Sequence, residues 1–170
     1  QTAAEFLRTI SESELERILR EYGEERYARR IARAIVQSRR TQAIQTTGQL
    51  ASIIQKTVPP SYRYGRLHCA TRTFQAIRIA LNQELEGLQT AIQDAVDLLS
   101  PGGRICVISF HSLEDRIVKQ TFRALAATPE PVLSILTKKP LTPTPDERQV
   151  NPRSRSAKLR VAERREGVAA

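Results

Sequence analysis

A turn, a short strand and a capped helix follow one another in the second half of the chain. Residues 100–103 (SPGG) form a sharp turn, and residues 104–109 (RICVIS) are a short β-branched run between turn signals. Such a run is typical of a buried strand in a mainly parallel sheet. Ser112 with Asp115 three residues later predicts that a capped helix follows. Because a helix also precedes the turn, the order predicts an α/β layered fold.

The residues before the turn predict a series of helices. In residues 1–58, Ser11 followed by Glu14 predicts a helix start, and a second helix is expected from Glu24 to about Arg40. Thr47 is expected to cap a third, short helix.

A basic, aromatic link at residues 61–69 leads into the next helical region. Residues 70–99 carry apolar side chains at steps of three and four, which predicts a buried helical face. We expect a break in this region near Asn82 or Gly87.

The composition changes after residue 128, where prolines recur. Residues 132–137 and 158–162 are the best strand candidates there, and we expect them to pair antiparallel at a sheet edge. From Lys138 to Arg165 the chain has nine Lys or Arg against three acids. This end of the chain is therefore strongly basic.

The net charge of +9 bears on the class of partner. Lysines and arginines that neutralise phosphates release counterions, so a basic chain suits a nucleic acid. A solvated basic surface without any ligand explains the charge equally well. Charge alone leaves both interpretations open.

Other bulk features favour a cytoplasmic protein without a membrane segment. No run of 18 apolar residues occurs, and the first twenty residues alternate apolar and charged positions, unlike a signal peptide. Cys69 and Cys106 fit no metal-ligand spacing, so we expect reduced thiols and no metal site, with Cys106 in the core. The chain has no methionine and begins with Gln1, which predicts a piece of a longer protein.

His111 and Ser112 are candidate functional residues because they lie where the predicted strand ends. In open α/β sheets, ligands bind outside the carboxyl ends of the strands. His111 could contact a substrate base or accept a proton, and it is the candidate catalytic residue. The alternative is that both residues only shape the loop and cap the helix.

Two basic clusters are candidate contacts to a phosphate backbone or a base edge. The first lies on one side of a predicted helix and comprises Arg72, Gln75 and Arg78. The second alternates with serines near the end of the chain and comprises Arg153, Arg155 and Lys158. An ordinary polar helix face and an exposed basic loop are the alternatives.

No recognisable cofactor-binding sequence occurs in the 170 residues. A nucleotide-cradling glycine loop follows a strand, whereas Gly102 and Gly103 precede theirs. We therefore expect no cofactor-binding residue in this chain.

Four longer stretches are specific enough to indicate a family. They are EYGEERYARRIA at 21–32, HCATRTFQAIRI at 68–79, VISFHSLEDRIVK at 107–119 and NPRSRS at 151–156. Together they closely resemble the bacterial 16S ribosomal RNA cytosine-N4 methyltransferases, the S-adenosylmethionine-dependent enzymes of MraW type. The resemblance spans nearly the whole chain.

The resemblance implies a Rossmann-like class I methyltransferase core with an all-α inserted domain. Residues 1–67 would be the inserted domain on the RNA side, and residues 68–170 the C-terminal part of the core. It also implies S-adenosylmethionine as the cofactor of the parent enzyme, small-subunit rRNA as partner, and methyl transfer to N4 of a cytosine.

The family's cofactor loop, ribose-binding acid and target-facing region would all precede residue 1. We therefore expect the chain alone to be inactive, to need the missing N-terminal half as partner, and to leave an apolar edge open on strand 104–109. Marginal stability or self-association would follow. A non-catalytic RNA-binding module and an interaction protein that completes its sheet with another chain are the alternative functions.

Overall fold

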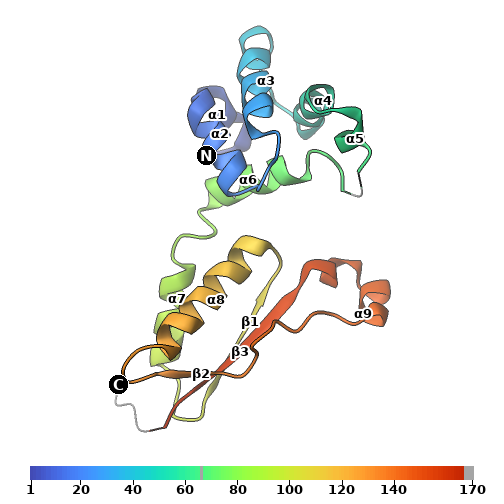
Figure 1. Ribbon diagram of the computed structural model, residues 1–170. Helices are drawn as coiled ribbons and strands as arrows, with labels where there is room; N and C mark the ends of the chain where they lie inside the picture. Colours follow the sequence, from blue (N-terminus) through green and yellow to red (C-terminus); the bar gives the residue numbers. More distant parts are fainter. Residues whose placement is uncertain (66, 167–170) are drawn as a thin grey trace. The chain divides into compact units, whose positions relative to one another are not determined.

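The computed structural model describes residues 1–65 and 67–166. It contains two compact units, Gln1–Glu84 and Leu85–Ala170 (Figure 1). The first unit contains only helices among its described residues, and the second combines helices with a sheet.

The described residues of the first unit form six helices. Their bounds are α1 Ala3–Thr9, α2 Glu12–Glu21, α3 Ala28–Thr41, α4 Thr47–Thr57, α5 Pro60–Arg63 and α6 Thr71–Asn82. Ser11 caps α2 by accepting a hydrogen bond from the Glu14 amide, as predicted. The cap of α4 is Thr46, one residue before the predicted Thr47, and Gln49 bonds back to it.

The core of this unit lies where α2 and α3 pack against each other, with α4 on α3 and α6 on α2. Leucines and isoleucines fill it; the most enclosed are Leu15, Leu19, Ile31, Ile35 and Ile54. Each such side chain stabilises the fold by about 1.5–3 kcal/mol relative to an exposed one. A Cβ on Gly23 would lie 2.7 Å from the carbonyl oxygens of Leu19 and Arg72, so α2 and α6 meet there only because the residue is glycine.

A buried carboxylate ties the helices of the first unit together. Glu25 is 3% exposed and accepts hydrogen bonds from the Tyr27 amide at 2.9 Å and the Tyr62 hydroxyl at 2.8 and 3.0 Å. The Tyr27 and Tyr62 rings meet edge to face. Burial, followed by the hydrogen bond to Glu25, raises the pKa of Tyr62 to about 12.

The predicted helical region 70–99 is interrupted where the sequence indicated. Helix α6 ends at Asn82, Gln83 has a φ of 52° and Gly87 a φ of 77°, and the next helix begins at Leu88. Helix α6 packs on α1 and α2, so the first compact unit extends past residue 67. The boundary at residue 67 concerns the domains of the family fold and stays a prediction.

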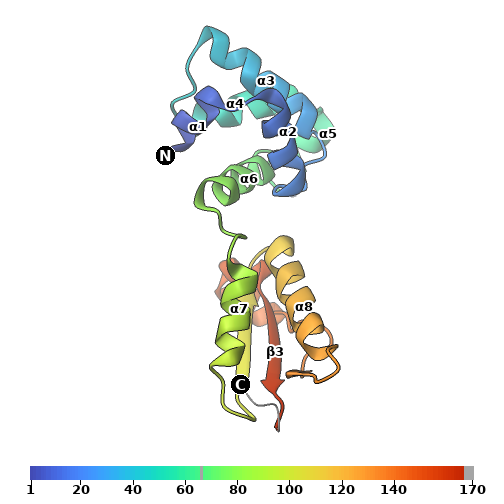
Figure 2. The ribbon, with the colours of Figure 1, turned by 90° about the vertical axis from the view of Figure 1, so that its left-hand side faces the viewer.

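The second unit is a small antiparallel sheet with helices on one face. Its elements are α7 Leu88–Asp97, β1 Arg104–Ser109, α8 Ser112–Ala126, β2 Leu133–Ile135, α9 Pro145–Val150, the 3₁₀ helix η1 Pro152–Ser156 and β3 Lys158–Arg164. The strand order is β1-β3-β2, and β3 is antiparallel to both neighbours. Figure 2 shows α7 and α8 side by side against this sheet.

The core of the second unit lies between the two long helices and the sheet. Ile92 and Val96 of α7 and Val118 and Phe122 of α8 pack here with Leu133 and Ala162 of the strands. Arg164 is 5% exposed, and its Nη1 donates to the carbonyls of Asp97 and Leu99 at 2.6 Å. This arginine therefore supplies hydrogen bonds to carbonyl groups at the C-terminal end of α7, as cations at helix C-termini do.

Two sequence predictions about the strands have different outcomes. The antiparallel pairing of the two late strands is confirmed, with Leu133 opposite Arg164 and Ile135 opposite Ala162. The prediction of a mainly parallel sheet is wrong for the described residues, because β1 pairs there only with β3 and runs antiparallel to it.

Strand β1 has one covered face and one open face. Ile105 and Val107 pack on the core, whereas Cys106 is exposed and Ile108 is 58% exposed. The prediction that Cys106 lies in the core is therefore wrong. Its apolar neighbours indicated burial, but the side chains on its face of β1, those of Arg104, Cys106 and Ile108, are all exposed.

Candidate substrate site at the start of helix α8

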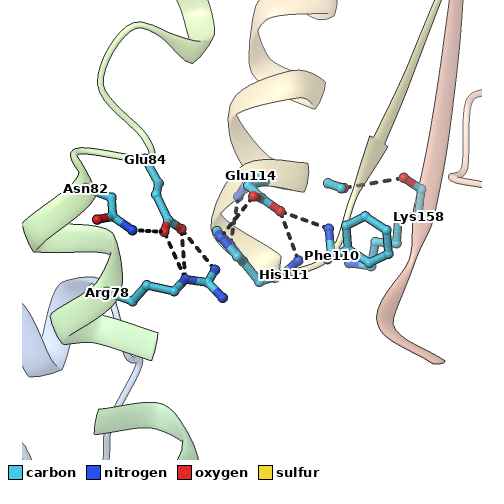
Figure 3. A network of polar contacts seen from close by, with 8 residues as sticks. Arg78, Asn82, Glu84, Phe110, His111, Glu114 and Lys158 are labelled. Atoms are coloured by element: carbon cyan, nitrogen blue, oxygen red, sulfur yellow. Dashed lines mark hydrogen bonds and ion pairs between the residues drawn. The ribbon is translucent and has the colours of Figure 1, made fainter. Parts of the chain in front are cut away.

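His111 is the N-cap of α8, and its partner is Glu114. Strand β1 ends at Ser109, and His111 Nδ1 then accepts a hydrogen bond from the Glu114 amide at 3.3 Å. Glu114 Oε2 bonds back to the amides of Phe110 at 2.8 Å and His111 at 3.2 Å (Figure 3). The predicted cap of Ser112 with Asp115 is thus wrong by one residue. Two reciprocal bonds fix the loop between strand and helix.

The capping hydrogen bond determines which tautomer a neutral His111 ring adopts. Because Nδ1 accepts a hydrogen bond, a neutral ring carries its proton on Nε2. That nitrogen lies 3.2 Å from Glu114 Oε1, and the side chain is 9% exposed. In a neutral ring the Nδ1 lone pair is therefore used by the cap. The geometry favours the capping interpretation, and the catalytic role of His111 stays a prediction.

Asp115 joins α8 to β3 through two cations. Arg160 Nε lies 2.7 Å from Asp115 Oδ1, and Lys158 Nζ lies 3.0 Å from Oδ2. Asp115 and Arg160 are 8% and 6% exposed. Burial raises the pKa of Asp115, but the hydrogen bonds and charges of Arg160 and Lys158 outweigh it, so the pKa lies below its ordinary value.

This ion-pair cluster changes the interpretation of Lys158. The sequence suggested an RNA contact, whereas the structure pairs its ammonium group with Asp115. Sequence reasoning missed Arg160 and Asp115 as members of the cluster. A signal was present, because Lys158, Arg160 and Arg164 are spaced by even numbers and so share one face of a strand.

Arg153 and Arg155 occupy the turn of 3₁₀ helix that leads into β3. Both are exposed, whereas Ser154 between them is 5% exposed and its hydroxyl donates to the Asn151 carbonyl at 2.8 Å. Strand β3 begins with Lys158, which is opposite Ser109, the last residue of β1. The structure thus brings His111, Ser112 and the Arg-Ser segment to the same end of the sheet.

The other predicted cluster lies on α6 in the first unit. Arg72 Nη1 donates to the Glu24 carbonyl at 2.7 Å, and Gln75 is half-buried. Arg78 Nε lies 2.9 Å from Glu84 Oε1, to which Asn82 also donates (Figure 3). Both arginines therefore have partners within their own unit.

Gly102 and Gly103 do not form a loop of the kind that holds S-adenosylmethionine after a strand. Gly102 and Gly103 lie at the start of β1, away from its carboxyl end. Their backbone extends the sheet: the Gly102 amide donates to the Arg164 carbonyl at 2.9 Å, and the Arg164 amide donates to the Gly103 carbonyl at 2.8 Å. These glycine groups are therefore used within the fold.

The described residues contain neither a metal-binding cluster nor a membrane-spanning helix. No group of His, Cys, Asp and Glu there is arranged to hold a metal ion. Within the same residues, no helix combines the length and apolar character needed to cross a membrane.

Comparison with known proteins identifies the family. The model of the MraW methylase family matches residues 1–165. The chain belongs to the MraW methylase family. This confirms the resemblance carried by the four sequence stretches.

Relatives within the MraW family carry the name ribosomal RNA small subunit methyltransferase H. The proteins from Persephonella marina and Nostoc sp. are 52% and 54% identical over 164 and 163 residues, and that from Pelobacter propionicus is 50% identical over 177. Each alignment covers 96% of this chain and 55%, 51% and 56% of the respective relative. The chain thus spans about half the length of these MraW relatives.

Proposed function

We propose that this chain forms part of an rRNA methyltransferase that moves a methyl group from S-adenosylmethionine to N4 of a cytosine in small-subunit rRNA. The observation that carries the proposal is the identity of 50–54% to proteins named small subunit rRNA methyltransferase H, over 96% of the chain. The proposed substrate is in the cytoplasm, which would be the location of the enzyme.

The chain would contribute RNA-facing surface to this enzyme. Its net charge of +9 suits a polyanion. Arg153 and Arg155 are exposed beside the start of β3, where guanidinium groups can bind phosphate oxygens. The Phe110 amide donates a hydrogen bond to Glu114, which fixes the backbone of Phe110 at the carboxyl end of β1. Phe110 is 55% exposed there.

The reaction needs close positioning of the target base. The lone pair of the cytosine N4 is delocalised into the ring, so the enzyme gains most by holding the amine in line with the methyl group. The loop fixed by His111 and Glu114 offers a rigid element for that purpose. Arg72, Gln75 and Arg78 are proposed substrate contacts of the first unit.

We propose that the 170 residues alone neither bind S-adenosylmethionine nor methylate RNA, because their glycines do not form a cofactor loop. Isothermal titration calorimetry of the chain with S-adenosylmethionine tests this. We expect no heat of binding, and a micromolar dissociation constant would contradict the proposal.

A chimera tests the proposed activity. In the chimera, this chain replaces the segment of the Nostoc relative that aligns with it. The chimera is incubated with methyl-labelled S-adenosylmethionine and with small ribosomal subunits from a strain that lacks the Nostoc enzyme. We expect label in the small-subunit rRNA. A folded chimera that transfers no label, beside an active Nostoc protein, would contradict the proposal.

One observation favours a second candidate function, an interaction protein that completes its sheet with another chain. The outward face of β1 exposes Cys106 and Ile108, and no strand among the described residues pairs with its free edge. Exposed strand edges favour pairing with other strands. Sedimentation of the chain over a range of concentrations tests this: self-association supports it, and a monomer throughout contradicts it.

A further inference from the structure

A basic pocket lies in the second unit between α8 and strands β2 and β3. Its volume is about 330 Å³, and its lining residues are Lys119, Phe122, Arg123, Ile135, Thr137, Lys138 and Arg160. Because a water molecule takes up about 30 Å³, the pocket has room for a phosphate group with part of its hydration shell. The lining contains four cations and no carboxylate.

Three of these cations are not neutralised. Across residues 1–65 and 67–166, no ion pair or side-chain hydrogen bond involves Lys119, Arg123 or Lys138. Lys119 and Arg123 are four residues apart on α8, where like charges on one helix face repel each other. The fold therefore holds several positive charges together, and a bound anion would relieve the repulsion.

The fourth cation is held rigidly at the wall of the pocket. Arg160 contacts Asp115 through Nε at 2.7 Å and Nη2 at 3.3 Å, which fixes the plane of its guanidinium group. Asp115 is shared with Lys158, so one negative charge faces two positive charges in this cluster. The cluster as a whole remains positive next to the pocket.

The apolar side chains of the lining strengthen the attraction between the pocket cations and an anion. Phe122 is 1% exposed, and Ile135 lies beside it in the packed core. Charges next to such low-dielectric walls interact more strongly with an anion than charges in open water. Lys119 is half-buried next to these walls, whereas Arg123 and Lys138 are exposed at the rim of the pocket.

We infer that this pocket binds a backbone phosphate of the RNA substrate, with Lys119, Arg123 and Lys138 as its ligands and Arg160 as the fixed cation of the wall. The inference rests on the proposed function, since it assigns the phosphate to RNA. The pocket contacts a phosphodiester and no base edge, so it anchors RNA without reading its sequence.

RNA binding by the chain at several salt concentrations tests the inference. The probe is a fluorescently labelled hairpin from small-subunit rRNA, and the variant is Lys119→Gln with Arg123→Gln. Each lost phosphate contact lowers the slope of log K against log salt by about 0.7 for single strands and 0.9 for duplex. Because the pocket holds one phosphate, we expect the magnitude of the slope to fall by about 0.7–0.9 and the affinity at low salt to fall in parallel.

The matched control is Arg148→Gln with Arg165→Gln, which removes the same charge from exposed positions of the same unit. If both double variants change the slope equally, or if the pocket variant leaves it unchanged, the inference is overturned. A chain without salt-dependent RNA binding would also overturn it. Label transfer by the chimera decides separately whether the proposed function stands.

Inorganic phosphate distinguishes the source of the anion. Phosphate at millimolar concentration should compete with the hairpin for the wild-type pocket and should have less effect on the pocket variant. One result would overturn the assignment to RNA: phosphate raises the thermal stability of the wild-type chain through the pocket cations, but these cations do not contribute to hairpin binding. The site would then bind a free anion.

Discussion

Replacing Asp115 by alanine should destabilise the second unit strongly. The substitution leaves Arg160, which is 6% exposed, next to Lys158 without a counterion. Removing one partner of a buried ion pair costs about 3–5 kcal/mol, because the remaining charge stays desolvated. The loss is large beside the ~5–15 kcal/mol of a typical domain.

Urea unfolding followed by circular dichroism measures this loss, and two further variants make the reasoning specific. Lys158→Met should cost less than about 1 kcal/mol, because the lysine side chain is 36% exposed and exposed pairs contribute little. Asp115→Leu with Arg160→Met should recover most of the stability, because it removes both buried charges of this ion pair. If Asp115→Ala costs less than about 1 kcal/mol, or the double variant is as unstable as Asp115→Ala, the reasoning is refuted.

Four other perturbations have outcomes that follow from the structure. The pKa of Tyr62 is raised, so its contribution to stability should be complete below about pH 10.0 and be lost as the pH rises through about 12. An absorbance titration of the phenolate checks this. Tyr62→Phe should abolish this pH dependence of stability. Gly23→Ala should cost about 1–3 kcal/mol in urea unfolding because its Cβ meets two carbonyl oxygens at 2.7 Å. His111→Ala should cost about 1 kcal/mol in the same assay, whereas His111→Asn retains a cap; equal losses would exclude the capping role. Ile108→Lys should weaken self-association in sedimentation runs, and an unchanged concentration dependence would contradict an open apolar face.

Local sequence spacing predicted the starts of α2 and α4 to within one residue, but the second predicted helix begins at Ala28 and not at Glu24. Ser11 with Glu14 is a cap in the structure, whereas at α8 the cap moved from Ser112 to His111. The backbone of His111 is extended, with φ −139° and ψ 167°, and α8 begins at Ser112, one residue earlier than a Ser112 cap would allow. Sequence preference favours serine as a cap, but the end of β1 determines where the helix can begin.

Features that depend on distant residues could not be predicted from spacing. Asp115 and Arg160 are separated by 45 positions, and they meet because α8 packs on β3. The pattern of Cys106 and Ile108 indicated a strand buried on both faces, but burial depends on which elements cover the sheet. The antiparallel pairing of β1 with β3 likewise depends on a segment about fifty residues further along the chain.

The most direct test of the proposed function is the identity of the modified nucleoside. Small-subunit rRNA methylated by the chimera is digested to nucleosides and analysed by mass spectrometry against N4-methylcytidine and 5-methylcytidine standards. The proposal predicts N4-methylcytidine at one cytosine of the rRNA, and its absence from RNA incubated with this chain alone. Label in another nucleoside, or none from a chimera whose Nostoc parent is active, would contradict it.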